Sequence, residues 1–324
     1  MIANEEQLAL LTLCALRADT TTLDWHLLGR TCQSSAHLAM LLAGDIPEDS
    51  PVARRMLPVL RQALPDVKAA RARAEAELEA AEAAGAGLVT VLDAAYPANL
   101  RLVPNLPPFL FYRGALNARD ARSVAVVGTR EVTPEGQARA SRMARGLTEA
   151  GVIVYSGLAK GVDTCAHTAA LAAGGRTAAV MGTGIASKIY PAQNTRLAQD
   201  IVEAGGVLFS QFWPTSTPAR WTFPRRNITM SGATLGSVVV EASHTSGAKM
   251  QARIAAEHGK QVFLLRSLVA AQPWAAKMLA DGRAVEVGEL ADVLERLAEP
   301  ARIQRASWQR RQLAEADQLL LTDL

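Results

Sequence analysis

From residue 123 onward, short apolar runs alternate with segments in which apolar and charged residues mix at helical spacing. The apolar runs predict strands at 123–128, 152–157, 177–182, 207–212, 237–242, 261–265 and 284–288. The intervening segments that predict helices are 134–150, 161–173, 194–204 and 247–258. Strands that are apolar on both faces and alternate with helices predict a parallel sheet covered on both sides, so we expect a doubly wound α/β domain.

The first 86 residues show a different, helical pattern. "EEQLALLTLCALRA" has apolar residues at helical spacing, and "VKAARARAEAELEAAEAAGAG" predicts an Ala/Glu/Arg helix that Gly85 and Gly87 stop. The charged faces of this second helix favour a solvated connector. The following stretch, 88–116, contains prolines at four positions, which suits an extended linker or an edge strand better than a helix.

These changes of pattern predict a division into three parts. We expect a small helical N-terminal domain over 1–86 and an α/β domain over 87–296, whose lead-in segment is 87–118. An amphipathic Arg/Gln/Leu-rich segment over 297–324 predicts a short helical tail.

Composition narrows the class of protein. Hydrophobic residues make up 49% and charged residues 20%, as in ordinary globular proteins, and a net charge of +3 permits a polyanionic partner only where the basic side chains cluster. The three cysteines show no metal-ligand spacing, so we expect neither a disulfide framework nor a zinc site. Two glutamates stand where a signal peptide has its basic region, and no run is long enough to span a membrane. We therefore expect a cytoplasmic protein without a membrane partner.

Ligands of open parallel sheets bind beyond the carboxyl ends of the strands, and those ends are rich in glycine here. Glycine lets a ligand approach the backbone, and helix N-termini offer free N–H groups and partial positive charge. The strand ends therefore predict a phosphate-binding edge, although tight turns between strand and helix also favour glycine. The candidate site residues at these ends are glycines together with hydroxyl-bearing and basic residues. They are Gly128, Thr129, Arg130, Ser156, Gly157, Lys160, Gly161, Gly182, Gly184, Ser246 and Gly247.

The familiar catalytic signatures are missing from this edge. The sequence contains no G-x-G-x-x-G turn after the first of these strands, no Walker motif, no nucleophile elbow and no H-E-x-x-H pair. His167 is expected to be a packed, hydrogen-bonded histidine, and Glu241 is a candidate acid or base without a placed partner. We therefore predict no catalytic residue, no metal site and no cofactor.

A basic and aromatic stretch lies between the fourth and fifth of these strands, at 211–232. It places Arg225, Arg226 and Asn227 beside Trp221 and Phe223. Guanidinium groups suit phosphates and aromatic rings stack on bases, which favours a nucleic-acid ligand. The alternative is a loop whose aromatic side chains fill the core and whose arginines are solvated.

Several stretches together resemble the DprA/Smf family of DNA-processing proteins: "VAVVGTR", "SGLAKGVDTCAHTAAL", "GGRTAAVMGTGIASKIYPAQN", "FPRRN" and "VVVEASHTSGAKMQARIAAEHGKQVF". The similarity runs in unbroken order over about 88–265. The resemblance implies an extended Rossmann domain behind a small helical domain, and homodimers formed through the Rossmann domain. It also implies a non-enzymatic protein that binds single-stranded DNA and helps load the RecA recombinase during natural transformation.

The resemblance also assigns roles to residues. Arg130 and Lys160 match pocket residues that grip the DNA backbone, and Arg225, Arg226 and Asn227 match the basic loop of the family. The matching pocket positions are Gly128, Ser156, Gly157, Gly161, Gly182 and Gly184. This sequence departs from the family pattern at three places. Ile228 replaces a further basic residue of the basic loop, and Lys249, which follows Ser246-Gly247, could supply that positive charge instead. Arg266-Ser267 replaces a Pro-Gly pair.

A second hypothesis stays open at this level. Lysine-decarboxylase-like phosphoribohydrolases share this superfamily scaffold, and a nucleotide-handling enzyme or nucleotide sensor is the alternative function. Their P-G-G-x-G-T-x-x-E signature corresponds here to "SGATLGSVVVEA", which keeps two glycines and Glu241 but lacks the double glycine.

Overall fold

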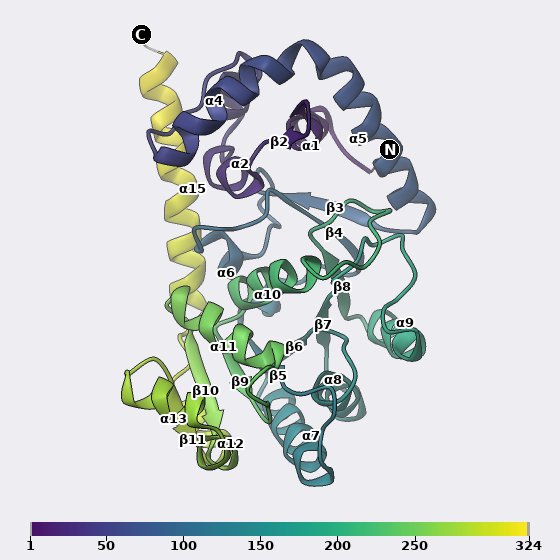
Figure 1. Ribbon diagram of the computed structural model, residues 1–324, viewed down its shortest axis with the longest axis vertical. Coiled ribbons are helices and arrows are strands. Elements are labelled where there is room, and N and C mark those ends of the chain that lie inside the picture. Colours follow the sequence, from purple (N-terminus) through teal and green to yellow (C-terminus); the bar gives the residue numbers. More distant parts are fainter. Residues whose placement is uncertain (1, 323–324) are drawn as a thin grey trace.

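The computed structural model describes residues 2–322 and is built around one sheet of nine strands (Figure 1). The strand order is β11-β10-β9-β5-β6-β7-β8-β4-β3. The strands of this sheet are β3 (Gly87–Thr90), β4 (Phe109–Gly114), β5 (Ser123–Val127), β6 (Ile153–Ser156), β7 (Thr177–Val180), β8 (Val207–Ser210), β9 (Gly236–Val239), β10 (Gln261–Leu265) and β11 (Val285–Val287). Every predicted strand after residue 122 is present, which confirms the α/β class.

The sheet is mixed, because one edge departs from the predicted parallel arrangement. Strands β5 to β11 pair in parallel, whereas β4 pairs antiparallel with both β8 and β3. The prediction for 88–116 is correct for β3, which is an edge strand, but β4 is flanked on both sides and a short helix, α6 (Ala98–Arg101), lies between the two. Pro107 and Pro108 immediately precede β4, where their missing N–H groups cost no ladder bond.

Helices cover both faces of the sheet. Along β5, Val124 and Val126 face one core with α7 (Pro134–Glu149), α8 (Val162–Ala172) and α14 (Leu290–Leu294). The alternate residues Ala125 and Val127 face the other core, because strand side chains alternate between faces. The helices of the second face include α10 (Thr222–Ala233) and α11 (Gly247–Glu257), and the remaining helices of this domain are α9 (Thr195–Glu203), α12 (Arg266–Ala271) and α13 (Pro273–Ala280).

The N-terminal helices lie beyond β3 and β4 at one end of the molecule (Figure 1). They are α1 (Glu5–Ala15), α2 (Trp25–Thr31), α3 (Ser35–Leu42), α4 (Pro51–Ala63) and α5 (Val67–Ala83), with a small hairpin of β1 (Arg17–Ala18) and β2 (Thr21–Thr22). The prediction that the charged helix is only a solvated connector is wrong. Its apolar residues Ala70, Ala74, Leu78 and Ala81 form a buried stripe, and α5 packs against α1.

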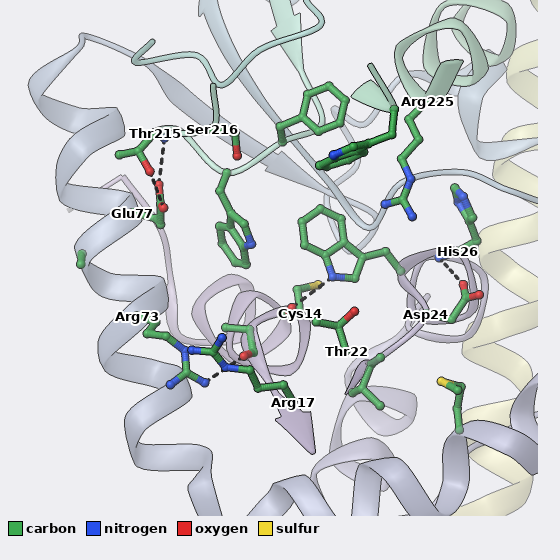
Figure 2. A pocket seen from close by; sticks show the side chains of 18 residues that line it. Cys14, Arg17, Thr22, Asp24, His26, Arg73, Glu77, Thr215, Ser216 and Arg225 are labelled. Carbon is green, nitrogen blue, oxygen red and sulfur yellow. Dashed lines mark hydrogen bonds between the residues drawn. The ribbon is translucent and has the colours of Figure 1, made fainter. Parts of the chain in front are cut away.

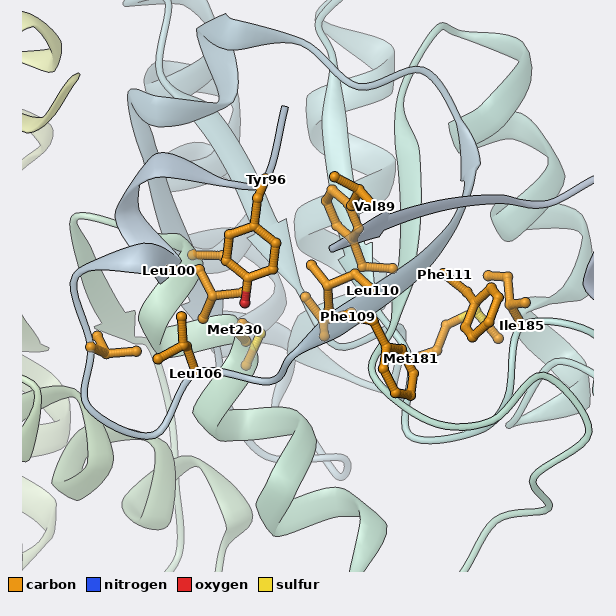
Figure 3. Close-up of a cluster of buried hydrophobic side chains, with 14 of the residues drawn as sticks. Val89, Tyr96, Leu100, Leu106, Phe109, Leu110, Phe111, Met181, Ile185 and Met230 are labelled. Atoms are coloured by element: carbon orange, nitrogen blue, oxygen red, sulfur yellow. The ribbon is translucent and has the colours of Figure 1, made fainter. Parts of the chain in front are cut away.

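The lead-in segment joins these helices to the sheet. Figure 3 shows Tyr96, Leu100 and Leu106 of this segment on the same side as Met230 from α10, in the buried cluster that also contains Phe109. The buried guanidinium of Arg101 donates to the carbonyl oxygens of Val91 (2.6 Å) and Asp93 (2.8 Å) and to Oε1 of Gln33 in the N-terminal region (2.9 Å). A buried charge needs such partners, so this segment has a fixed conformation rather than that of a free linker.

The predicted tail contains a helix, α15 (Pro300–Thr322), and residues 323–324 of that prediction lie outside the described residues. This helix packs against α6 of the lead-in segment.

The division into domains at 86 and 296 stays a prediction. Within residues 2–322, no helix has both the length and the apolar character that crossing a bilayer requires.

Candidate nucleic-acid interface

A cavity of about 440 Å³ opens beyond the carboxyl ends of β5 and β9. The chain leaves β5 toward β6 on one side and returns to β9 on the other, so these two strand ends form the topological switch point of the sheet. We call this cavity the strand-end pocket. The predicted site residues that line it are Gly128, Thr129, Arg130, Arg226, Asn227, Ser246 and Gly247.

The Gly-Thr-Arg turn after β5 is fixed by its neighbours. The N–H of Thr129 donates to the carbonyl oxygen of Glu241 (2.7 Å), and the carbonyl oxygen of Thr129 accepts from the N–H of Val162 (3.2 Å). A Cβ built on Gly128 would overlap Val162 and lie 2.8 Å from the Glu241 oxygen. Glycine is therefore needed here so that the start of α8 can pack against the strand end, and Arg130 then projects from a rigid turn.

Arg226 supplies a buried positive charge at the base of the strand-end pocket. Only 7% of the residue is exposed, its Nη1 donates to the carbonyl oxygen of Val180 (3.2 Å), and its Nε has no hydrogen-bond partner. Burial lowers the pKa of this guanidinium, and the charge of Asp163 opposes that shift. A buried guanidinium with an unused N–H group is suited to an anionic ligand that enters the pocket.

Asp163, in the first turn of α8, is a site residue that the sequence analysis did not single out. Its carboxylate accepts from the N–H groups of Gly157 (3.1 Å) and Ala159 (3.3 Å) and so holds the turn after β6. Burial raises the pKa of Asp163, while the nearby charge of Arg226 opposes the shift. An acidic residue two positions after Gly161, at the start of a helix, was the available signal.

Aromatic side chains form a ledge beside the pocket. The guanidinium of Arg130 lies over the ring of Phe223, 5.5 Å from its centre, and the ring of Tyr190 lies 5.7 Å from that of Phe223. Gly182 lies behind this ledge, since a Cβ there would come within 2.8 Å of Phe223. Tyr190 is 47% exposed and was also missed, although it belongs to the "GIASKIYPAQN" stretch that follows β7.

The basic stretch at 221–227 is helical, which contradicts the loop of the alternative interpretation, while its role in binding nucleic acid stays a prediction. It is the start of α10 rather than a loop, so Arg225, Arg226 and Asn227 belong to the first turn and a half of a helix. The alternative of core aromatics and solvated arginines is wrong for Trp221, which is 56% exposed, and for Arg226, which is buried. Arg225 is exposed and turns away from the strand-end pocket, with its guanidinium 5.2 Å from the centre of the Trp221 ring.

The other predicted site residues lie outside the lining of the pocket. Lys160 is exposed in the turn before α8. The N-cap residue of α8 is Gly161, which has a φ of +78° and offers no side chain to cap the helix. Ser156 is buried and donates to the carbonyl oxygen of Val126 (2.7 Å), and Lys249 is half-buried in the first turn of α11. Gly157 lies against the Arg226 guanidinium, and Gly184 lies against the backbone of Trp213 and Pro214.

The two candidates for acid–base chemistry have structural contacts. His167 is fully buried with Nδ1 2.8 Å from Oγ1 of Thr177, as predicted, and burial, with a smaller effect of Arg226, lowers its pKa to about 3. The carboxylate of Glu241 accepts from Oγ1 of Thr133 (2.8 Å), the N-cap residue of α7. In the described part of the chain, no three His, Cys, Asp or Glu residues are grouped so that they could hold a metal ion.

Comparison with known proteins agrees with the resemblance in the sequence. A family model described as DNA recombination-mediator protein A matches residues 87–298. DNA processing protein DprA of Streptococcus pneumoniae is 39% identical over 176 residues, which are 54% of this chain and 61% of that protein. Protein Smf of Escherichia coli is 40% identical over 170 residues, which are 52% of this chain and 45% of that protein. The chain thus spans about half the length of these curated relatives.

Two solved structures share the fold. The X-ray structure of DNA processing protein A from Streptococcus pneumoniae has a TM-score of 0.72 and 29% identity, over 92% of this chain and 100% of that one. DNA processing protein A from Helicobacter pylori, whose structure describes a single-stranded DNA binding mode of that protein, has a TM-score of 0.57 and 23% identity, over 66% of this chain and 97% of that one. The second match supports the fold alone. Since the family model covers well over half of the sequence, this protein belongs to the DNA recombination-mediator protein A family, the family of the DprA and Smf proteins.

Proposed function

We propose that this protein is a non-enzymatic, single-stranded DNA-binding recombination mediator that protects exposed strands and helps load RecA. The observation that carries the proposal is the meeting of Arg130, Arg226 and the ring of Phe223 at the switch point of the sheet. Guanidinium groups neutralise phosphates, and an aromatic ring beside them gives a base a surface on which to stack.

The same geometry favours single strands without sequence preference. The guanidinium groups of Arg130 and Arg226 in the pocket suit phosphates, and contacts to phosphates carry no sequence information. Bases are free to stack on Phe223 or Tyr190 only when they are not paired in a duplex. We therefore expect the strand to be recognised through its backbone and its flexibility.

The role in natural transformation, the RecA contact, the homodimer and the cytoplasmic location are proposed from membership of the family. A dimer would align two strand-end pockets and raise their effective concentration on one strand. Light scattering tests the dimer, and a monomer at micromolar concentration contradicts it. The mediator role is tested by RecA nucleation on strands coated with single-strand-binding protein, where an absence of stimulation despite intact DNA binding contradicts it.

DNA binding itself is tested by fluorescence anisotropy with a labelled oligothymidylate and a blunt duplex of equal length. At about 50 and about 200 mM salt, affinity for the single strand should be higher and should fall steeply as salt rises, because counterions are released. Equal affinity for the duplex, or a flat salt response, overturns the proposal. Release of free base from nucleoside monophosphates would instead support a nucleotide-handling enzyme.

A further inference from the structure

A second cavity, of about 750 Å³, lies between the N-terminal helices and the sheet domain (Figure 2). Its walls come from parts of the chain that are far apart in sequence. Arg17 and Arg73 lie on the side of α5, whereas Arg225 reaches in from α10. We call it the aromatic cavity, because Trp25, Phe212, Trp213 and Trp221 line it.

The aromatic cavity carries an excess of positive charge. None of its three arginines forms an ion pair within residues 2–322, and Arg73 donates only to the carbonyl oxygen of Ala15 (2.9 Å). Guanidinium groups without an ion-pair partner on two sides of a cavity are complementary to an anionic ligand.

The two carboxylates of the cavity are already engaged. Glu77 accepts from the N–H (3.0 Å) and Oγ1 (2.7 Å) of Thr215, and Asp24 accepts from the N–H groups at the start of α2. Burial lowers the pKa of His26, so its imidazole stays neutral at pH 7 and adds no charge. The three arginines outnumber the two carboxylates, so the lining keeps a net positive charge for a ligand.

The tryptophans fall into two groups. Trp25 and Trp213 meet edge to face at 5.5 Å and both contact Phe109, at 5.0 and 5.2 Å, so they help to hold the helices on the sheet. Trp221 has no such role, since it is 56% exposed, contacts the edge of Phe212 at 5.8 Å and lies beneath the Arg225 guanidinium. An exposed indole that is stacked with a guanidinium offers a flat surface to a base.

The aromatic cavity adjoins the strand-end pocket across one turn of helix. Arg226 lines the strand-end pocket, whereas the preceding residue Arg225 lines the aromatic cavity. Consecutive helical residues lie about 1.5 Å apart along the axis and point about 100° apart around it, so the two side chains leave the same turn of α10 in different directions. A chain of phosphates that crosses this turn can contact both arginines.

We propose that the aromatic cavity is a second subsite for the same single strand, which stacks a base on Trp221 and places phosphates against Arg225, Arg73 and Arg17. This inference rests on the proposed DNA-binding function and extends it to the N-terminal region. A strand suits the cavity better than a free nucleotide, because Arg225 lies on a different wall from Arg17 and Arg73 and a strand carries a phosphate for each wall.

The test compares oligothymidylates of about 6 and about 20 nucleotides, a range that spans known single-strand site sizes. Arg17 is exposed and unpaired, so Arg17→Glu should leave the fold intact. We expect this variant to lose at least about tenfold in affinity for the long oligonucleotide and to bind the short one as the unaltered protein does. Arg122→Glu is the control, because Arg122 is an exposed arginine at the opposite, amino-terminal end of β5.

The outcomes separate the inference from the function on which it rests. If the unaltered protein binds neither oligonucleotide, the DNA-binding function fails. If it binds both and Arg17→Glu weakens the long one no more than Arg122→Glu does, the second subsite is absent.

Quenching of tryptophan fluorescence by the long strand should be lost in Trp221→Phe but kept in Trp308→Phe. Quenching by thymidine monophosphate alone, abolished by Arg17→Glu, would mean a free-nucleotide site and contradict the strand path.

Discussion

The guanidinium of Arg226 occupies the space that a side chain at position 157 would need. A Cβ built on Gly157 would overlap the guanidinium carbon and nitrogens, and the N–H of Gly157 is held by Asp163 (3.1 Å). The glycine in the turn after β6 is thus required by a buried protein charge, and the conformation of the turn and the position of the arginine depend on each other.

Gly157→Ala should displace Arg226 from the strand-end pocket. We expect weaker binding of single-stranded DNA and a loss of about 1–3 kcal/mol in the free energy of unfolding, as is usual for overpacked sites. Anisotropy and urea denaturation measure the two effects. Gly247→Ala is the stability control, since an added Cβ there meets nothing within 4 Å. A Gly157→Ala protein that matches the unaltered one in both measurements would contradict the contact.

Arg130→Ala and Lys160→Ala should each weaken DNA binding while the melting temperature stays the same. Both side chains are exposed in turns at the strand ends, so neither contributes to a core. Each lost phosphate contact should reduce the slope of log affinity against log salt by about 0.7 to 1. Arg122→Ala is the matched control, and an Arg130→Ala/Lys160→Ala double variant with undiminished affinity would exclude these turns from the interface.

Tyr190 should contribute through its ring rather than through charge. Tyr190→Ala is expected to cost about 1–3 kcal/mol of binding to oligothymidylate, which is the range for one stacked base. The salt slope should not change, because no phosphate contact is lost. Tyr190→Phe keeps the ring and should bind normally. If it binds as poorly as Tyr190→Ala, the hydroxyl group and not stacking makes the contact.

The buried histidine should make stability depend on pH. The pKa of His167 falls from 6.5 in the unfolded chain to about 3 in the fold, so the unfolded state binds the proton more readily. Its contribution to stability is complete above pH 6.5 and is lost as the pH falls toward 3, by about 1.4 kcal/mol per pH unit. His258, whose pKa burial lowers to about 4, acts in the same direction.

Urea denaturation between about pH 7.5 and about pH 5.5 measures this dependence. His167→Gln removes the titrating group, and we expect its free energy of unfolding to change less with pH than that of the unaltered protein. Equal slopes for the two proteins would show that His167 keeps an ordinary pKa in the fold.

Local sequence pattern determined the framework of this protein. The predicted strand at 123–128 and the predicted helix at 134–150 match β5 and α7 to within one residue at each end, because period and turn chemistry act between neighbours in the chain. The strand-end rule then located the pocket that Gly128 and Arg130 line, since the carboxyl ends of parallel strands share one edge. The motifs at those ends were also specific enough to indicate the family.

Tertiary structure decided which of the candidate residues meet. Arg225 and Arg226 are neighbours in sequence and chemically equivalent, but the start of α10 turns one toward the aromatic cavity and buries the other in the strand-end pocket. The antiparallel edge formed by β4, like the approach of Arg226 to Gly157, depends on contacts between segments that the chain brings together only when it folds. Residue type and spacing reveal which groups are available, whereas burial and direction, which give a guanidinium its environment, are set by packing.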